Sequence, residues 1–469
     1  MMKVVGIIGA GAAGLCAARH VSASSCMTPI VWEKASRVGG TWVYTSQVGK
    51  DENGLPIHSS MYKNLKTNLP KELMAFPDFP FPAKEESFVH HTDVLSYLEE
   101  YTSHYNLHQY IKFRHHVEKV KPVDRDDGTH GWAVTVQDLE TNSTTTSLCD
   151  SILVCNGHYS VPVIPPIKDV DKFQGQQMHS HDYREAEPFR GLRVAVLGAS
   201  ASGLDISLEV ASVAKEVLLS HNHPVQIPSE LPPNVRQVRG IVAAYEDGFV
   251  FGDGSHADAD VLLYCTGYKF TFPFLSEECG VTVENNIVKP LYKHLIHTAF
   301  PTMAFVGIPF QIVPFPLFDV QVRFFLAVLT GDVTALTPQK MDADTSHALQ
   351  HLRRSGGHER HYHRMGVEGS VHYMKELSAS AHLSPVAPYF LWFYKLIFLR
   401  MVFSLLTVKQ HRYTVEADGR VREWHNGREV KTVWNLMWLV VVQLMCLLWR
   451  DFWRVFSFAT KTLRKYLGV

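Results

Sequence analysis

The sequence predicts an α/β protein with two parallel-sheet domains, one inserted into the other, and an apolar helical segment at its C-terminal end. A short apolar run, a glycine turn and a helical stretch follow one another near residue 9, and the same order recurs near residue 198. Strand, glycine turn and helix in this order are typical of a Rossmann-like, dinucleotide-binding domain. A third observation is an uncharged run over residues 432–449, which predicts the apolar segment.

The composition limits the classes of function. A chain of 469 residues is too long for one core, so two or three domains are expected. Lys and Arg total 45 against 46 Asp and Glu without a long run of one sign, so nucleic acid is not an expected partner. The seven cysteines form no CxxC pair, which argues against a zinc site or disulfide scaffold and favours a reducing compartment.

No metal site is predicted. The 26 histidines are spread along the chain, and no spacing typical of metal ligands occurs. His358, His361 and His363 form the densest group, and we interpret this group as solvated surface because the surrounding stretch is polar.

The first glycine turn lies in KVVGIIGAGAAGLCAARHV and is expected to hold the pyrophosphate of a dinucleotide. Its first glycine permits the tight turn, the second lets the backbone approach the phosphates, and the third lets the helix pack on the strand. The next strand, PIVWEK, ends in an acid that can accept hydrogen bonds from an adenosine ribose, which favours this reading over a secretory signal. The residues predicted to bind this first cofactor are Gly9, Ala10, Gly11, Ala12, Ala13, Gly14 and Glu33.

The second glycine turn lies in LRVAVLGASASGLDISLEVA, where a serine replaces the middle glycine. The following strand, KEVLLSH, ends where the 2′-phosphate of NADPH would lie, with Arg236 or Arg239 as the alternative position for that phosphate. A repeat that no longer binds a nucleotide is the other interpretation of this turn. The residues predicted to bind the second cofactor are Gly198, Ser200, Ser202, Gly203, Ser220 and His221.

Two such units about 190 residues apart imply a flavoprotein that holds FAD at the first turn and NADPH at the second. The segment HADADVLLYCTGYKFTFPFL is expected to return the chain from the inserted domain, with Gly267 at the reversal. The predicted organisation is an FAD-binding domain over 1–161 and 271–345, an NADP-binding domain over 162–270, a polar connecting region over 346–385 and an apolar membrane-associated tail over 386–469.

The stretch FQGQQMHSHDYR lies between the two turns and carries Phe173, Gly175, His179 and Tyr183. These four residues fit the FxGxxxHxxxY/F signature, and the chain resembles the flavin-containing monooxygenases from about residue 3 to residue 335. The stretches EKASRVGGTWVYT, NLKTNLPKELMAFPDFPFP, CNGHYSVP and YCTGYKFTFPF add to the resemblance, which looks closer to the shorter plant- and invertebrate-type members. The final tyrosine favours the N- and S-oxygenating branch over Baeyer–Villiger enzymes, which carry a tryptophan there.

The resemblance implies an NADPH- and dioxygen-dependent monooxygenase with FAD as its cofactor. Through a flavin hydroperoxide it would insert one oxygen atom into a soft nucleophilic nitrogen or sulfur of a small molecule, as an N,N-dialkylaniline-type monooxygenase does. Baeyer–Villiger oxygenation of ketones and a flavin-binding membrane protein without turnover stay open as alternatives.

By the same resemblance, Asn68 in KTNLPKE is the expected catalytic residue, placed beside the flavin and the nicotinamide. Its amide can donate to a reacting oxygen without supplying an acidic proton. The stretch FPLFDVQVRFFLAVLTGD is expected to form a helix from about Asp319 to Gly331 whose positive end would stabilise a reduced flavin. The further cofactor contacts that the resemblance implies are Gly40, Thr41, Trp42, Thr67 and Gln321.

The C-terminal end contains two apolar stretches. PYFLWFYKLIFLRMVFSLLTV is interrupted by Lys395 and Arg400, whereas the 18 residues over 432–449 are uncharged and borderline for crossing a bilayer of about 30 Å. Between them EADGRVREWHNGREV predicts a hairpin. Flanking tryptophans and basic residues suit contact with membrane lipid, with a buried core helix as the alternative. The location expected from related family members is the endoplasmic reticulum membrane, with the catalytic domains facing the cytosol and a homo-oligomer left open.

Overall fold

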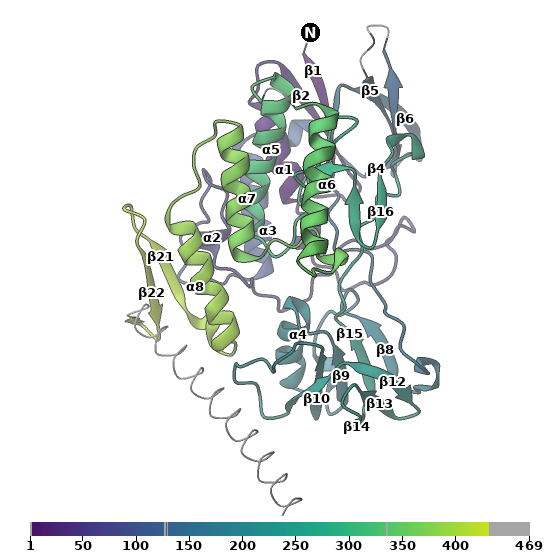
Figure 1. Cartoon of the computed structure of the whole chain (residues 1–469), viewed down its shortest axis with the longest axis vertical. Helices are drawn as coiled ribbons and strands as arrows, with labels where there is room; N and C mark the ends of the chain where they lie inside the picture. Colours follow the sequence, from purple (N-terminus) through teal and green to yellow (C-terminus); the bar gives the residue numbers. More distant parts are fainter. Residues whose placement is uncertain (1, 126–127, 129, 334–335, 431–469) are drawn as a thin grey trace, which may run out of the picture.

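The structure is a computed structural model that describes residues 2–125, 128, 130–333 and 336–430 (Figure 1). Its first sheet has the strand order β18-β19-β20-β7-β1-β2-β3. The neighbours β20, β7, β1, β2 and β3 run parallel, and β18 and β19 add an antiparallel edge. The strands are β1 (Lys3–Ile8), β2 (Met27–Glu33), β3 (Ile111–Phe113), β7 (Ser151–Val154), β18 (Leu291–Tyr292), β19 (Ile296–His297) and β20 (Met303–Phe305).

Helices cover one face of this sheet, and a small antiparallel sheet covers the other (Figure 1). The alanine-rich α1 lets α5 approach closely, and α5 in turn packs on α7. On the opposite face, Trp32 and Trp132 pack together in a second core. The elements are α1 (Ala12–Ser22), α2 (Lys71–Met74), α3 (His91–His104), α5 (Pro314–Thr330), α6 (Pro338–Arg354), α7 (Gly366–Ser380), β4 (His115–Asp124), β5 (His130–Asp138), β6 (Thr144–Cys149), β16 (Thr282–Glu284) and β17 (Ile287–Lys289).

The second sheet has the order β11-β10-β9-β15-β8, and all its neighbouring strands are parallel. We call the part around the first sheet the larger body, and the part around the second sheet, residues 173–264, the smaller body (Figure 1, below). The elements of the smaller body are β8 (Gln176–His179), β9 (Arg193–Leu197), α4 (Ala201–Ala211), β10 (Glu216–His221), β11 (Val235–Arg239), β12 (Ile241–Tyr245), β13 (Gly248–Phe251), β14 (His256–Asp258) and β15 (Val261–Tyr264).

The predicted α/β class is confirmed, with mixed sheets that are consistent with two Rossmann-like domains. The chain leaves the first sheet after β7 and re-enters it at β18 and β19, before β20 pairs in parallel with β7. The smaller body is therefore formed by chain that lies between two neighbouring strands of the larger one.

Helix α5 is longer than predicted. It begins at Pro314 rather than near Asp319, because Val313 is extended and a proline at the first helical position is compatible with helix initiation. Its end agrees with the prediction, since Gly331 has a φ of 84° and accepts the left-handed conformation that ends many helices.

The chain over residues 386–430 is folded against the larger body, which corrects the predicted start of a tail at residue 386. Helix α8 (Tyr389–Phe403) buries Phe393 and Ile397 in the same core as α5 and α7, while Trp392 and Phe398 are exposed. The predicted hairpin is present, and its elements are β21 (Arg412–Val415), β22 (Val421–His425) and β23 (Arg428–Glu429).

The uncharged run over 432–449 lies outside the described residues, so a membrane-associated segment there stays a prediction. Among the residues that the structure describes, none of the helices is both long and apolar enough to cross a bilayer.

A buried ion pair fixes α8 to the hairpin. Arg400 donates from Nε and Nη2 to the two carboxylate oxygens of Glu423, each at 2.9 Å. The Tyr413 hydroxyl donates to Glu423 at 2.9 Å, and His411 Nδ1 lies 2.8 Å from the same carboxylate. The arginine that interrupts the apolar stretch is thus the residue that docks it.

Breaking this pair is expected to destabilise the protein. Burial would raise the pKa of Glu423, but His411 and Arg400 outweigh burial and hold that pKa at about 2, below the ordinary 4.5. A carboxyl with a depressed folded-state pKa stabilises the fold fully above pH 4.5, and this contribution is lost as the pH falls towards 2. The linked free energy is about 3 kcal/mol.

Glu423→Gln leaves Arg400 buried without its counter-charge, so we expect a loss of about 3–5 kcal/mol at pH 7. Urea unfolding at pH 7 and at pH 3.5 measures the effect, and the gap between wild type and variant should narrow at the lower pH. Glu429→Gln, at a half-exposed glutamate of β23, is the control. An equal gap at both pH values would contradict the assigned role of Glu423.

Candidate functional site

The first glycine turn connects β1 to α1 and has no room for side chains at two positions. A Cβ on Gly9, whose φ is 102°, would lie 2.7 Å from the carbonyl oxygen of Cys155. A Cβ on Gly14 would lie 1.8 Å from the carbonyl oxygen of Gly9. The α1 N-terminus begins at Gly11 without a side-chain cap, so its backbone N–H groups and positive dipole end are available to a phosphate.

The second turn, between β9 and α4, repeats this geometry. A Cβ on Gly198, whose φ is 112°, would lie 2.5 Å from the carbonyl oxygen of Cys265. A Cβ on Gly203 would lie 1.9 Å from the carbonyl oxygen of Gly198. Ser200 takes the N-cap position of α4 in an extended conformation, is exposed and makes no side-chain cap hydrogen bond. Both turns therefore combine a close approach of strand and helix with a helix N-terminus that carries no side-chain cap, as is typical of turns that bind dinucleotide phosphates.

Glu33 lies at the end of β2, beside the first turn. Its Oε2 accepts a hydrogen bond from the Ala10 backbone N–H at 2.7 Å, and its Oε1 accepts from Ala35 N–H at 2.8 Å. Burial raises the pKa of Glu33, and these two N–H groups oppose that shift. The carboxylate thus supports the turn itself, a role that the sequence did not indicate, while remaining at the predicted ribose position.

The VGGTW stretch lies against the same turn. Gly39 donates its backbone N–H to the Ala10 carbonyl at 3.1 Å, and a Cβ on Gly40 would lie 3.0 Å from the Gly11 Cα. Trp42 follows and meets Phe315, in the first turn of α5, edge to face at 6.4 Å. The Thr41 carbonyl accepts a hydrogen bond from the Ser59 hydroxyl at 2.8 Å.

Thr67 and Asn68 belong to a connecting segment, residues 57–68, that runs along both bodies. The Thr67 N–H donates to the Val89 carbonyl at 2.9 Å, and its buried Oγ1 accepts from Val89 N–H at 3.2 Å. The Asn68 side chain is exposed and has no hydrogen-bond partner among the described residues. Its amide is available to a ligand.

Gln321 is placed differently from the prediction. It is fully buried in α5, where its Oε1 accepts from Gly307 N–H and its Nε2 donates to the Tyr373 hydroxyl, both at 2.9 Å. Both ends of this amide are used inside the protein, so Gln321 supports the turn that follows β20.

Ser220 and His221 are also engaged within the fold. The buried Ser220 hydroxyl donates to the Arg239 carbonyl at 3.0 Å and accepts from Ile241 N–H at 3.1 Å. His221 Nδ1 accepts from His223 N–H at 3.2 Å, so its Nε2 carries the proton and donates to Gln237 at 3.1 Å. Because burial lowers the pKa of His221, this ring is neutral near pH 7.

Arg239 on β11 is a cation beside this strand end. It lies opposite His221 in the parallel register of β10 and β11, is exposed, and donates to the His223 carbonyl at 2.8 Å. The sequence left Arg236 or Arg239 open as the position of the NADPH 2′-phosphate, and that position stays a prediction.

The signature stretch has a structural explanation that begins at its glycine. A Cβ on Gly175 would lie 2.3 Å from the Phe173 ring and 2.4 Å from the Asp260 carbonyl oxygen. The Phe173 ring packs on Phe249 at 4.6 Å. These contacts fix the start of β8 against its neighbour β15.

The other two signature residues lie where the bodies meet. His179 ends β8, and its ring lies against Tyr268 at 5.2 Å. Tyr183 is fully buried against the Tyr62 ring of the connecting segment at 5.3 Å. The signature residues therefore join the smaller body to this segment.

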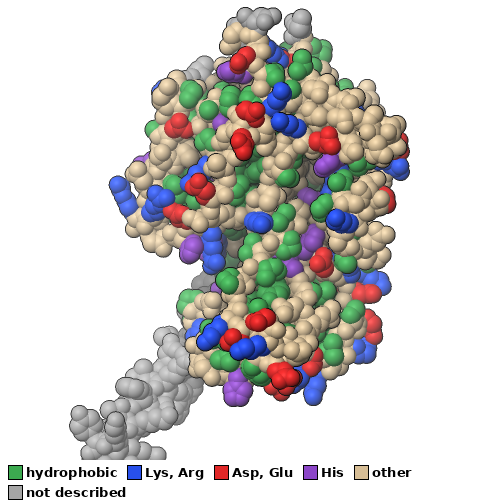
Figure 2. Space-filling model, turned by 90° about the vertical axis from the view of Figure 1, so that its right-hand side faces the viewer, with side chains coloured by type: hydrophobic (Ala, Val, Ile, Leu, Met, Phe, Trp, Pro, Cys, Tyr) green, Lys and Arg blue, Asp and Glu red, His purple; other side chains and the backbone are tan. Residues whose placement is uncertain are grey.

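Histidines that the sequence analysis did not single out gather beside His179. His58, His158 and His181 come from distant segments, and His58 interacts electrostatically with the other two. Burial lowers the pKa of His58, His158 and His179 to about 4, so these rings are neutral near pH 7. Figure 2 shows an indentation between the two bodies with histidine side chains beside it. No local sequence pattern could have grouped them.

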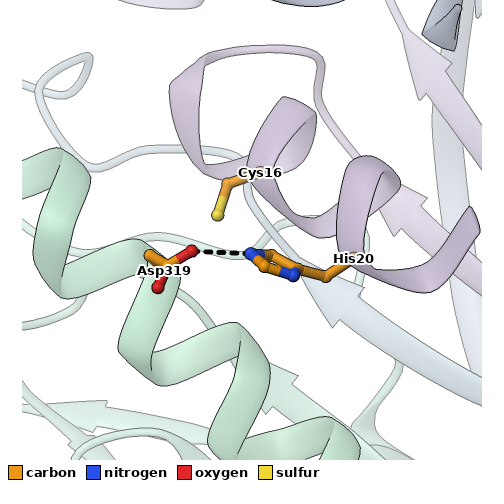
Figure 3. Close-up of side chains that lie close together, drawn as sticks. All are labelled: Cys16, His20 and Asp319. Carbon is orange, nitrogen blue, oxygen red and sulfur yellow. Dashed lines mark hydrogen bonds and ion pairs between the residues drawn. The ribbon is translucent and has the colours of Figure 1, made fainter. Parts of the chain in front are cut away.

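A further group, Cys16, His20 and Asp319, connects α1 to α5 and has the composition of a metal site (Figure 3). His20 Nε2 donates to Asp319 Oδ1 at 2.6 Å, and Arg323 lies 3.4 Å from the other carboxylate oxygen. Burial raises the pKa of the Cys16 thiol and lowers the pKa of the His20 ring, so both groups are neutral near pH 7. We interpret the His20–Asp319 contact as a hydrogen bond that joins α1 to α5.

His363 corrects the interpretation of its sequence group as solvated surface. The ring is fully buried, accepts from Val288 N–H at 3.0 Å and lies 2.9 Å from His294 Nδ1. Its polar sequence neighbours concealed a residue that turns inward.

Comparison with known proteins decides the family. The family model described as "Flavin-binding monooxygenase-like" matches residues 2–231 and 226–437. The chain belongs to this family. The match continues through residues 386–430, beyond the resemblance seen in the sequence, in agreement with the folded C-terminal segment.

Relatives and solved structures agree with this assignment. The flavin-containing monooxygenases FMO GS-OX-like 2 and FMO GS-OX5 of Arabidopsis thaliana are each 37% identical, over 79% and 81% of this chain and 83% and 85% of theirs. The S-allyl-L-cysteine S-oxygenase of Allium sativum has a TM-score of 0.79 at 34% identity, covering 86% of this chain and 93% of its own. Tmm from a Pelagibacter species has a TM-score of 0.78 at 28% identity, covering 89% and 96%.

Members of this family depend on FAD and NADPH, and the residues present fit both cofactors. The two glycine turns would hold the phosphates, and Glu33, beside the first turn, would accept hydrogen bonds from a ribose. The protein is a flavin monooxygenase by family.

Arg239→Gln tests the position of the NADPH phosphate. We expect the KM for NADPH to rise by about tenfold, from the loss of one charge-assisted contact, with the KM for NADH unchanged. Because arginine stays charged and His221 is neutral, the preference for NADPH should hold from pH 7 to 9. Steady-state kinetics with both nucleotides measures the effect, with Arg236→Gln as the control. A preference that falls with rising pH would return the role to His221.

Proposed function

We propose that this protein is an NADPH- and dioxygen-dependent S-oxygenase of small thioethers. The observation that carries the proposal is the pair of equivalent glycine turns on two joined bodies, together with the free Asn68 amide on the segment between them. Similarity to an S-allyl-L-cysteine S-oxygenase over most of both chains favours sulfur as the acceptor atom. The N,N-dialkylaniline activity that the resemblance suggested has no comparable support.

The reaction consumes one thioether, one dioxygen, one NADPH and one proton, and gives a sulfoxide, NADP⁺ and water. Bound FAD would supply the hydride acceptor and the activation of dioxygen. The turn at Gly9 to Gly14 would hold FAD, and the turn at Gly198 to Gly203 would hold NADPH with its 2′-phosphate on Arg239.

Asn68 would donate a hydrogen bond to the reacting oxygen. A carboxamide proton is not acidic, so it can stabilise developing charge without protonating the oxygen prematurely. His158 and His179 at the junction of the two bodies are neutral near pH 7 because burial lowers their pKa, so they supply no acidic proton there. Trp42 and the surrounding parts of the two bodies would exclude water from the reacting oxygen.

A substrate panel tests the proposal. Purified, FAD-loaded protein is supplied with NADPH and, in turn, S-allyl-cysteine, N,N-dimethylaniline and cyclohexanone. We expect S-allyl-cysteine to give sulfoxide more than ten times faster than the amine or the ketone gives oxygenated product. A tenfold ratio of rates corresponds to a difference of about 1.4 kcal/mol in activation free energy. Ester formation from the ketone without sulfoxide would identify a Baeyer–Villiger enzyme, and no NADPH oxidation at all would support a protein without turnover.

Asn68→Ala should keep FAD bound but release most of the oxygen as hydrogen peroxide. Loss of one preorganised donor costs about 3 kcal/mol of transition-state stabilisation, so sulfoxide formed per NADPH should fall steeply. Peroxide and sulfoxide are measured in the same reaction. Asn53→Ala, in an exposed turn, is the control. Unchanged coupling in the Asn68 variant would remove this residue from the mechanism.

A further inference from the structure

One ammonium group connects three parts of the chain. Lys409 lies in the short helix η7 (Val408–Gln410), between α8 and the C-terminal hairpin. Its Nζ donates to Asp205 Oδ1 at 2.5 Å and to the Lys66 carbonyl at 3.0 Å. Asp205 is on α4, two residues after Gly203, and Lys66 directly precedes Thr67 and Asn68. The same nitrogen therefore binds the helix of the NADPH turn and the loop of the candidate catalytic amide.

The Asp205 carboxylate is shared with the connecting segment. The Tyr62 hydroxyl donates to Asp205 Oδ2, and burial raises the pKa of Tyr62, so this hydroxyl remains a donor. The side chains of Lys409 and Asp205 are only 27% and 28% exposed. Such partial burial reduces solvent screening, so this pair is stronger than an ordinary surface ion pair.

A second carboxylate on α4, that of Glu209, adds negative charge that the Lys409 ammonium offsets. Glu209 lies one helical turn after Asp205 and accepts a hydrogen bond from Asn64 Nδ2 at 2.8 Å. Burial is the largest cause that raises the pKa of Glu209, and the negative charge of Asp205 raises it further. The positive charge of Lys409 lowers it. Without Lys409, two like charges on α4 would face the connecting segment with no ion-pair partner among the described residues, which disfavours their close approach to it.

Lys409 is held on the larger body by contacts that do not involve the smaller one. The Arg400–Glu423 pair locks α8 to the hairpin, and the Tyr413 N–H donates to the Ser87 hydroxyl at 2.7 Å. The same segment reaches the smaller body a second time, where the Leu405 N–H donates to the Ser229 hydroxyl at 2.8 Å. Residues 386–430 thus form a brace, fixed at one end and bound to the smaller body at two points.

We propose that Lys409 is a positioning residue that orients the NADPH-binding helix α4 relative to the loop of Asn68. The inference rests on the proposed function and extends it: the brace couples NADPH oxidation to oxygen transfer. Rigid placement of two reactants contributes much of a catalytic rate, and an error of about 1 Å costs on the order of a hundredfold. A residue outside both glycine turns can therefore control coupling.

The test compares Lys409→Met, Lys409→Arg and the control Lys395→Met, which removes the exposed ion pair between Lys395 and Glu368. Hydrogen exchange of peptides over residues 62–68 and 201–211 is followed in the FAD-loaded protein without nucleotide. The affinity for NADP⁺ and the peroxide released per NADPH are measured separately.

Lys409→Met should retain FAD, exchange faster in both peptides, bind NADP⁺ about tenfold more weakly and release more peroxide. Lys409→Arg should restore all three properties, since arginine keeps the charge and can donate to both acceptors. Lys395→Met should match the wild type. If Lys409→Met lost FAD, the same measurements on Asp205→Asn would decide whether the ion pair positions α4. This substitution removes only the charge of the partner of Lys409.

Unchanged exchange in both peptides would overturn the bracing role, and faster exchange with unchanged coupling would overturn the link to oxygen transfer. Failure of the proposed function is recognised separately, because the wild type would then give no sulfoxide, while the exchange measurement would still decide whether Lys409 fixes α4.

Discussion

The site depends on two turns where strand and helix approach too closely for any side chain. At each turn a Cβ on the third glycine would lie within 2 Å of the carbonyl oxygen of the first glycine, at 1.8 and 1.9 Å. This close approach leaves the α1 and α4 N-termini uncapped by side chains and directs their backbone N–H groups to the carboxyl ends of the two sheets. Glu33, Gly39 and Gly40 then pack around the first turn, so much of the proposed FAD site follows from a single backbone constraint.

The two turns can act together only if the two sheets keep a defined relative position. Three contacts of the chain hold the two bodies together. Tyr183 of the signature packs on Tyr62, Asp205 of α4 bonds the same tyrosine, and Lys409 adds a bond from the C-terminal segment. The signature residues therefore help to join the two bodies. Burial lowers the pKa of the histidines at this joint, which leaves these rings uncharged near neutral pH.

Sequence reasoning found what local patterns determine. The glycine turns, the strand-ending acid, the end of α5 at Gly331 and the two glycine-containing turns of the C-terminal hairpin all depend on neighbours within a few residues. It missed what depends on distant partners. Arg400 looked like an interruption of an apolar stretch until Glu423 supplied its counter-charge, and His363 looked solvated until the fold turned it inward. Ser220 and His221 occupy the expected strand end, but β11 and β12 use their hydrogen-bonding groups, which no motif could reveal.

The central claim is that the two sites act together to move one oxygen atom from dioxygen to sulfur at the expense of NADPH. Incubation of the FAD-loaded protein with NADPH, S-allyl-cysteine and ¹⁸O-labelled dioxygen tests it most directly, with mass spectrometry of the sulfoxide and a parallel assay of NADPH. The account predicts one labelled oxygen in each sulfoxide and close to one NADPH consumed for each product. Sulfoxide without the label, or NADPH oxidised only to peroxide, would contradict it.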